Sequence, residues 1–314
     1  MKVFISGGAG VIARQLIPIL LKNGHVVYTG DLKPKPAEIG NISEYIHGDL
    51  NKLPLNYFDK NGIEVFINLA ASFERTRETL DFWNENFQNN INLSHHLMTA
   101  AQKSKSLKRI LFASSYLVYD EIQYLTNSFN SRPTELDISS YLKPRNLIGS
   151  SKLFHENELG FLQQFGELEF SVVIPRIYRG YGMGSRDVIS RWIQQSLRNE
   201  SLEVFDAQGM FDYIYCKDAA MGIYKLVMES SFEGVLDLGS GNSNSIESLL
   251  EIILRILPST SVNYLEMNSK KIEKSQANVD TLIKATGWRP EYTLENAIFE
   301  MVEYEKLRNG IRSS

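Results

Sequence analysis

The chain has 314 residues, of which 43% are hydrophobic, and a formal net charge of −4. This length exceeds what one hydrophobic core usually supports, so we expect one large domain with a smaller lobe, or two interleaved lobes. The slight negative charge gives no electrostatic basis for binding nucleic acid or an anionic membrane, which requires clustered Lys and Arg residues.

The cysteine and histidine content argues against disulfides and metal sites. Cys216 is the only cysteine, and the adjacent His95 and His96 would point about 100° apart on a helix, which does not make a metal clamp. The N-terminal KVFIS segment lacks signal-peptide anatomy, and no apolar run approaches about 18 residues. We therefore expect a cytoplasmic protein with no metal and no membrane segment.

The first half of the chain alternates short apolar runs with helical patterns. The runs read as buried strands and cover residues 2–6, 25–31, 65–71, 109–115 and 170–175. The helical patterns cover residues 11–24, 79–104 and 149–165. This alternation predicts an α/β fold with a doubly wound parallel sheet of the Rossmann type.

The second half is less regular. Helices are expected near residues 186–199, 216–229, 244–256 and 293–308, with a strand at 235–239. We expect a nucleotide-binding domain at 1–173 with a return segment at 211–240. Residues 174–210 and 241–314 would then form a smaller C-terminal substrate-binding lobe.

A glycine loop follows the first expected strand. In ISGGAGVIA, Gly7 and Gly10 stand between a strand and a helix, and Ala13 is the third small residue. The first backbone donors and the positive dipole end of such a helix suit a pyrophosphate. Asp31 ends the second expected strand, where a carboxylate can accept both ribose hydroxyls and would repel a 2′-phosphate. The pattern indicates a dinucleotide site for NAD, although Lys33 and Lys35 weaken the preference over NADP.

The order of further motifs resembles the extended short-chain dehydrogenases/reductases, the group of NAD-dependent nucleotide-sugar epimerases and dehydratases. The motifs are SGGAGVIA, GDL (48–50), NLAA (68–71), NNIN (89–92), SSYLVY (114–119), PRNLIGSSK (144–152), PRIYRGYG (175–182), FDYIYCKDAA (211–220), LGSG (238–241) and TGWRP (286–290). They span nearly the whole chain. The resemblance implies a dimeric NAD enzyme that acts on nucleotide sugars, in roles such as polysaccharide biosynthesis.

The resemblance also implies the contacts of NAD. The expected cofactor residues are Gly7, Gly10, Val11, Ile12, Asp31, Leu32, Asp49, Leu50, Leu69, Ala70, Ala71 and Lys152. Asp49 would face the adenine amino group, unless it is only an exposed turn aspartate. By the same resemblance, the helices at 79–104 and after Gly149 would form a homodimer interface; burial inside the monomer is the alternative.

The reaction centre departs from the family pattern. Ser115 matches the residue that binds the sugar hydroxyl, and Lys152 matches the lysine that binds the nicotinamide ribose and lowers the tyrosine pKa. The tyrosine position itself holds Ile148. Oxidation at the sugar C4 needs a group that removes the hydroxyl proton, and isoleucine cannot do so.

Three readings of this departure stay open. In the first, the chain is an epimerase- or dehydratase-type enzyme and Tyr116 is the relocated acid/base, with Tyr141, His155 and Glu156 as weaker candidates. In the second, it is a catalytically degenerate NAD(H)-binding module that acts as a sensor or partner protein. In the third, Lys152 is a solvated helix residue.

The substrate pocket is expected to be unusual as well. Phe211 stands where an arginine is frequent in the family, and Arg179 stands where an asparagine is usual. Arg176, Arg179, Arg186 and Arg191 are candidates for binding the diphosphate of the substrate, with solvated arginines as the alternative.

Overall fold

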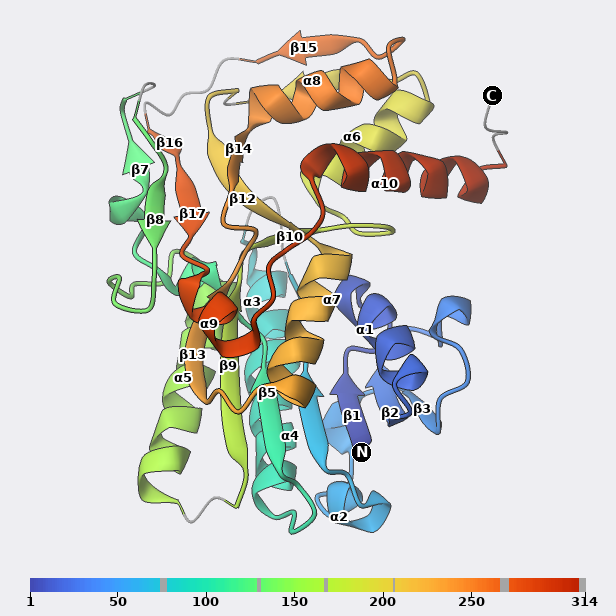
Figure 1. Cartoon of the computed structure of the whole chain (residues 1–314), viewed down its shortest axis with the longest axis vertical. Coiled ribbons are helices and arrows are strands. Elements are labelled where there is room, and N and C mark those ends of the chain that lie inside the picture. Colours follow the sequence, from blue (N-terminus) through green and yellow to red (C-terminus); the bar gives the residue numbers. More distant parts are fainter. Residues whose placement is uncertain (74–77, 129–130, 167–168, 206, 266–270, 311–314) are drawn as a thin grey trace.

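The computed structural model describes residues 1–73, 78–128, 131–166, 169–205, 207–265 and 271–310. Its centre is a parallel sheet in the order β3-β2-β1-β4-β5-β9-β13, with the short β6 paired to β9 (Figure 1). The strands are β1 (Lys2–Ser6), β2 (Val26–Asp31), β3 (Glu44–His47), β4 (Val65–Asn68), β5 (Arg109–Phe112), β6 (Ser114–Ser115), β9 (Ser171–Ile177) and β13 (Gly234–Leu238). The expected doubly wound α/β fold is confirmed.

The strand order reverses between β1 and β4. The chain builds β1, β2 and β3 outward on one side, then returns to β4 and builds β5, β9 and β13 on the other. Connections leave the two central strands in opposite directions, which opens a crevice above their carboxyl ends. The loops after Ser6 and Asn68 therefore lie at the edge of the sheet where ligands bind in such folds.

Helices cover both faces of this sheet. One face carries α1 (Val11–Lys22) and α7 (Cys216–Tyr224), which pack against each other. Helix α7 continues directly into the π-helix η6 (Lys225–Glu229). The other face carries α2 (Tyr57–Asn61), α3 (Leu80–Asn86), the π-helix η3 (Phe87–Asn92), α4 (Leu93–Gln102) and α5 (Leu147–Phe165). The helix expected at 79–104 is thus interrupted by one π-helical turn.

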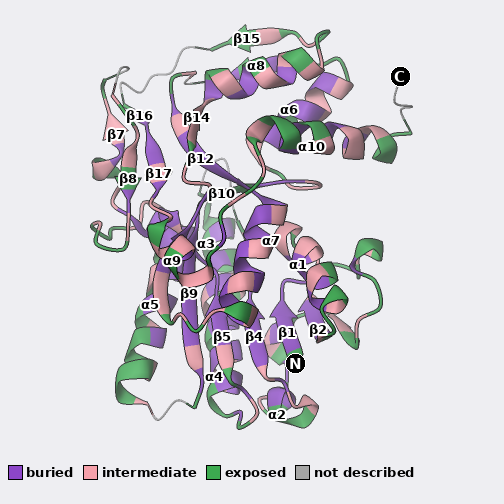
Figure 2. Ribbon diagram, viewed as in Figure 1, coloured by how far each residue is buried: buried purple, intermediate pink, exposed green. Residues whose placement is uncertain are grey.

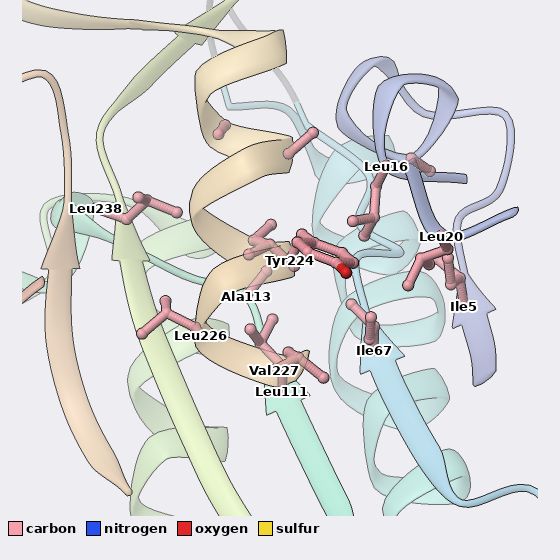
Figure 3. Close-up of a cluster of buried hydrophobic side chains, with 14 of the residues drawn as sticks. Ile5, Leu16, Leu20, Ile67, Leu111, Ala113, Tyr224, Leu226, Val227 and Leu238 are labelled. Carbon is pink, nitrogen blue, oxygen red and sulfur yellow. The ribbon is translucent and has the colours of Figure 1, made fainter. Parts of the chain in front are cut away.

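Two hydrophobic cores lie on the two faces of the sheet. Successive residues of β1 alternate between them, with Ile5 on the α1 and α7 side and Phe4 on the α4 side. Figure 3 shows Leu16, Leu20 and Tyr224 packed over Ile67 in the first core. Most strands of the central sheet are buried and the outer helix faces are exposed, as Figure 2 shows, whereas the edge strand β3 is only partly buried.

A smaller lobe lies beyond the carboxyl edge of the sheet (Figure 1). It contains the helices α6 (Val188–Leu197), α8 (Ile246–Ile256) and α10 (Leu294–Arg308). It also contains a three-stranded sheet of β10 (Arg179–Tyr181), β12 (Met210–Tyr215) and β14 (Ser243–Ser245), and a two-stranded sheet of β11 (Leu202–Val204) and β15 (Val262–Tyr264). Two further pairs join distant segments: β16 (Ile272–Glu273) with β7 (Leu125–Thr126), and β17 (Ser275–Ala277) with β8 (Thr134–Leu136). Helix α9 (Asp280–Thr286) returns toward β13.

Short 3-10 turns complete the structure, among them η1 (Ala37–Ile39), η2 (Leu50–Lys52), η4 (Tyr116–Val118) and η5 (Glu121–Gln123). None of the helices in the described ranges has the length and apolar character needed to cross a membrane.

Candidate functional site

The glycine loop closes tightly between β1 and α1. Gly7 has a φ of 81°, and a Cβ placed there would lie 2.9 Å from the backbone N and Cα of Ala70. The position therefore requires glycine, for both its conformation and the close approach of the next strand. Gly10 begins α1 without a side-chain cap. The first backbone N–H groups of this helix can consequently bind an anionic group such as a pyrophosphate.

A cavity of about 660 Å³ lies over this loop. Ten of the residues expected to hold the cofactor line it: Gly7, Gly10, Val11, Asp31, Leu32, Asp49, Leu50, Leu69, Ala70 and Ala71. Ile12 and Lys152 are not among the described lining residues, whereas Arg186 is. The ten come from four loops at the carboxyl edge, so the fold brings distant motifs of the sequence into one site.

Two carboxylates are fixed at the wall of this cavity. Asp31 accepts hydrogen bonds from the backbone N–H of Ala9 at 3.0 Å and of Lys33 at 2.9 Å. Asp49 caps η2 by accepting from the backbone and side-chain amides of Asn51, both at 2.9 Å. Held in this way, an ionised carboxylate presents its remaining lone pairs to ribose or adenine donors. The residues present therefore fit a dinucleotide.

Lys152 is buried on α5. Lys152 is 8% exposed, and its Nζ lies 4.8 Å from the ring centroid of Phe112, in cation–π geometry. Burial lowers the pKa of Lys152 to about 8, and the nearby Glu156 opposes that change. The reading of Lys152 as a solvated helix residue is therefore wrong.

Ile148 occupies an apolar site one turn before Lys152. It is buried and belongs to a hydrophobic cluster with Tyr116, Leu117 and Tyr178. Helix α5 begins just before it, because the Asn146 side chain accepts the Gly149 N–H at 2.8 Å. The side chain thus packs against the segment that carries Ser115 and Tyr116, in place of a group that could transfer a proton.

Ser115 and Tyr116 lie at the turn from β6 into η4, and β6 packs against α5. Ser115 Oγ accepts the Leu117 N–H at 3.3 Å. The Tyr116 hydroxyl donates to Glu273 Oε1 at 3.2 Å and accepts from Arg145 Nη2 at 3.0 Å. Burial raises the pKa of Tyr116; Arg179 and Arg145 counteract this rise and Glu273 adds to it. The structure thus holds the phenol as the centre of a polar cluster.

Three of the four predicted substrate arginines, Arg176, Arg179 and Arg186, occupy different surroundings. Arg176 is buried and bonds both carboxylate oxygens of Glu156, with Nε at 3.1 Å and Nη2 at 2.7 Å. Arg179 bonds Glu273 at 3.0 Å, and the exposed Arg186 lines the cavity. Arg176 is thus engaged inside the protein, whereas Arg179 and Arg186 are the more accessible members.

The other candidate bases differ in access. Both ring nitrogens of His155 are engaged, with Glu158 Oε2 at 2.7 Å and with the Asn90 carbonyl at 3.1 Å. Glu156 is bound by Arg176 and accepts a short hydrogen bond from Ser114 Oγ. Tyr141 is exposed. Across the residues with described placement, no group of three or more His, Cys, Asp or Glu side chains could hold a metal ion.

Sequence reasoning missed Arg145 and Glu273. Arg145 directly precedes the cap of α5, which is a signal that could have drawn attention to it. Glu273 lies 157 residues from Tyr116 along the chain and reaches it only because β16 pairs with β7. No local sequence pattern predicts such a contact.

The reversed strand order, the glycine loop and the two cavity-wall carboxylates define an α/β protein of the doubly wound class with a site that fits a dinucleotide. The family model described as "NAD dependent epimerase/dehydratase family" matches residues 3–236, and the chain belongs to this family.

Individual relatives are distant but nearly full-length. A putative UDP-glucose 4-epimerase of Methanocaldococcus jannaschii is 23% identical over 98% of this chain and 99% of its own. The solved structure of MoeE5 in complex with UDP-glucose and NAD is similar with a TM-score of 0.85 at 23% identity, covering 98% of this chain and all of its own. UDP-glucuronic acid 4-epimerase from Bacillus cereus, solved with NAD, gives a TM-score of 0.80 at 22% identity over 99% of this chain and all of its own.

Proposed function

We propose that the chain is an NAD-dependent enzyme of the epimerase/dehydratase type that acts on a nucleotide sugar by oxidation at the sugar C4. The observation that carries the proposal is the cavity at the strand reversal, where the glycine loop, Asp31 and Asp49 meet. The names of the similar proteins, which include nucleotide-sugar epimerases that bind NAD, support the same substrate class.

The chain's own residues divide the work of binding. The α1 N-terminus receives the pyrophosphate of the cofactor, and Asp31 accepts the adenosine ribose hydroxyls. Lys152 binds the nicotinamide ribose, and Ser115 binds the hydroxyl at the reacting carbon. Arg186, at the cavity wall, meets the substrate diphosphate. NAD, when bound, supplies the acceptor for the hydride of the sugar carbon.

Tyr116 is the proposed replacement for the missing acid/base. Because burial raises its pKa, Tyr116 is a neutral phenol at neutral pH. It would act by relay: the phenol oxygen takes the proton of the sugar hydroxyl while its own proton moves to Glu273 Oε1, 3.2 Å away. Arg145, which donates to the same phenol oxygen, would stabilise negative charge that develops there.

A second candidate function is a catalytically degenerate NAD(H)-binding module that acts as a sensor or partner protein. The observation that favours it is the burial of Ile148, an apolar side chain that stands where the family places its proton-transferring tyrosine. This module would bind NAD and leave every nucleotide sugar unchanged.

We also propose that the chain forms a homodimer through α3 and α5. These helices contact each other and expose large apolar side chains, among them Leu80, Trp83, Phe161 and Phe165. Trp83 is 59% exposed, and Phe161 and Phe165 stack with their ring centroids 6.0 Å apart. Large apolar side chains exposed on neighbouring helices are typical of a protein–protein interface.

The proposal is tested by calorimetry and product analysis on the same preparation. We expect saturable NAD binding, and a product from one of a set of UDP- and dTDP-sugars that is either an epimer or lighter by one water. Saturable NAD binding without any product would favour the module. Absence of NAD binding would refute both functions.

A further inference from the structure

The charged side chains around Tyr116 do not balance one another. Glu273 Oε2 accepts from Arg145 Nη1 at 2.7 Å and from Arg179 Nη2 at 3.0 Å. Within the described parts of the chain, no second carboxylate forms an ion pair with either arginine. Two guanidinium groups and one carboxylate leave one net positive charge in a largely buried setting, which is unfavourable unless an anion compensates it.

Hydrogen-bond donors in the same cluster also lack acceptors. Arg179 Nε and the hydroxyls of Tyr124 and Tyr213 are buried without a hydrogen-bond partner among the described residues. Tyr213 pairs in register with Arg179 on the neighbouring strands β12 and β10, so both side chains leave the same face. The ring of Tyr124 lies 5.6 Å from the Arg145 guanidinium. Buried polar groups are nearly always paired, so this cluster lacks an acceptor.

The two arginines of the cluster are partly accessible from outside. The Arg179 side chain is 33% exposed and that of Arg145 is 19% exposed, whereas Glu273 between them is 8% exposed. The Arg179 side chain is held in place, because its guanidinium stacks 3.9 Å from the ring centroid of Phe211. The N–H donors of this guanidinium are therefore positioned before any ligand binds, which lowers the entropic cost of binding.

We propose that Arg145 and Arg179, with the hydroxyls of Tyr124 and Tyr213, bind a carboxylate on the sugar of the substrate, so that the substrate is an acidic nucleotide sugar. This inference rests on the proposed function. A carboxylate matches the cluster because it carries one negative charge and offers about four lone-pair sites. The location also fits, because Tyr116, which contacts both Arg145 and Glu273, directly follows Ser115.

The test compares matched acidic and neutral ligands on the full chain loaded with NAD. Calorimetry with UDP-glucuronate and UDP-glucose measures the preference, and saturation-transfer NMR with free glucuronate and glucose measures it without a nucleotide. We expect the acid to bind about tenfold or more tightly than the neutral sugar, as for hydrogen bonds to a charged group. Arg179→Gln should remove most of this preference, and Arg179→Lys should leave an intermediate one.

Two further variants separate binding from folding. Tyr213→Phe should weaken binding of the acid severalfold without lowering the melting temperature, because its hydroxyl has no described partner to lose. Arg198→Gln is the matched control, since Arg198 forms its ion pair with Glu200 at the surface. Circular dichroism and NAD affinity confirm that each variant is folded.

Each outcome of these experiments either supports or overturns the carboxylate site. Equal affinity of the wild-type chain for the acidic and neutral ligands, or an acid preference that survives in Arg179→Gln and Tyr213→Phe, overturns the carboxylate site. Binding of free glucuronate that depends on Arg179, with no binding of either nucleotide sugar, supports the site and refutes the proposed substrate class. Failure of every acidic ligand to bind a chain that still binds NAD overturns the site.

Discussion

Lys152→Met exchanges a buried ammonium for an apolar side chain of similar length. The pKa of Lys152 falls from its ordinary 10.5 to about 8 in the folded protein, first because of burial. At about 1.4 kcal/mol per pKa unit, this difference corresponds to about 3 kcal/mol of destabilisation of the charged folded state. Loss of the cation–π contact with Phe112 reduces the stability gained by the substitution by about 1 kcal/mol. We therefore expect the variant without cofactor to be about 2 kcal/mol more stable at neutral pH.

The sign of the pH dependence follows from proton linkage. The unfolded chain keeps the lysine proton up to about pH 10.5, whereas the folded chain releases it near pH 8. Between these values the unfolded state binds more protons, so the wild-type protein gains stability as the pH rises. The advantage of Lys152→Met should be complete below about pH 8 and should disappear by about pH 10.5.

Urea denaturation of the cofactor-free protein across this pH range measures the effect. Lys103→Met is a suitable control, because Lys103 is exposed at the end of α4. A variant that is less stable than wild type at neutral pH, or a gap that does not change with pH, would refute the reasoning. Under the proposed function, turnover should be lost although stability rises.

Four further substitutions test the cofactor site, the relocated acid/base and the dimer contact. Gly7→Ala should cost about 1–3 kcal/mol of unfolding free energy and abolish NAD binding, because its Cβ would lie 2.9 Å from the backbone of Ala70 at a positive φ. Asp31→Asn should weaken NAD binding about tenfold by calorimetry and improve the relative binding of NADP, because the negative charge is lost. Tyr116→Phe should lower kcat about a hundredfold or more while NAD affinity stays unchanged. Trp83→Asp should shift the chain from dimer to monomer in analytical ultracentrifugation.

Each of these four has a contradicting result. Normal NAD affinity in Gly7→Ala would show that the glycine loop does not bind the cofactor. An unchanged ratio of NAD to NADP affinity in Asp31→Asn would show that Asp31 does not determine the choice of cofactor. Full activity of Tyr116→Phe would exclude the relocated acid/base. An unchanged sedimentation profile for Trp83→Asp would place the dimer contact elsewhere or exclude it.

The sheet was predictable because its signal is local. Buried parallel strands are short apolar runs between helical patterns, and the runs at 2–6, 65–71, 109–115 and 170–175 coincide with β1, β4, β5 with β6, and β9. The glycine loop was predictable for a similar reason, since strand, glycines and helix follow one another directly. The π-helical turn at 87–92 was not, because its residues differ little from a regular helix pattern.

The polar cluster at Tyr116 could not be predicted from local patterns. It requires β16 to pair with β7 across some 150 residues of sequence and so depends on tertiary contacts alone. The burial of Arg176 was hidden for the same reason, since its partner Glu156 lies on α5 while Arg176 itself lies on β9. Loop and helix arginines look alike in sequence whether they meet solvent, a carboxylate or a ligand.

The measurement that tests the central claim most directly is proton NMR of the purified chain with NAD and a panel of acidic and neutral nucleotide sugars in deuterated water. The account predicts a new sugar spin system, or deuterium incorporated at a ring carbon, in at least one of them. Unchanged spectra for every sugar, from a protein shown to bind NAD saturably, would contradict the enzyme and identify Ile148 as the mark of a lost reaction.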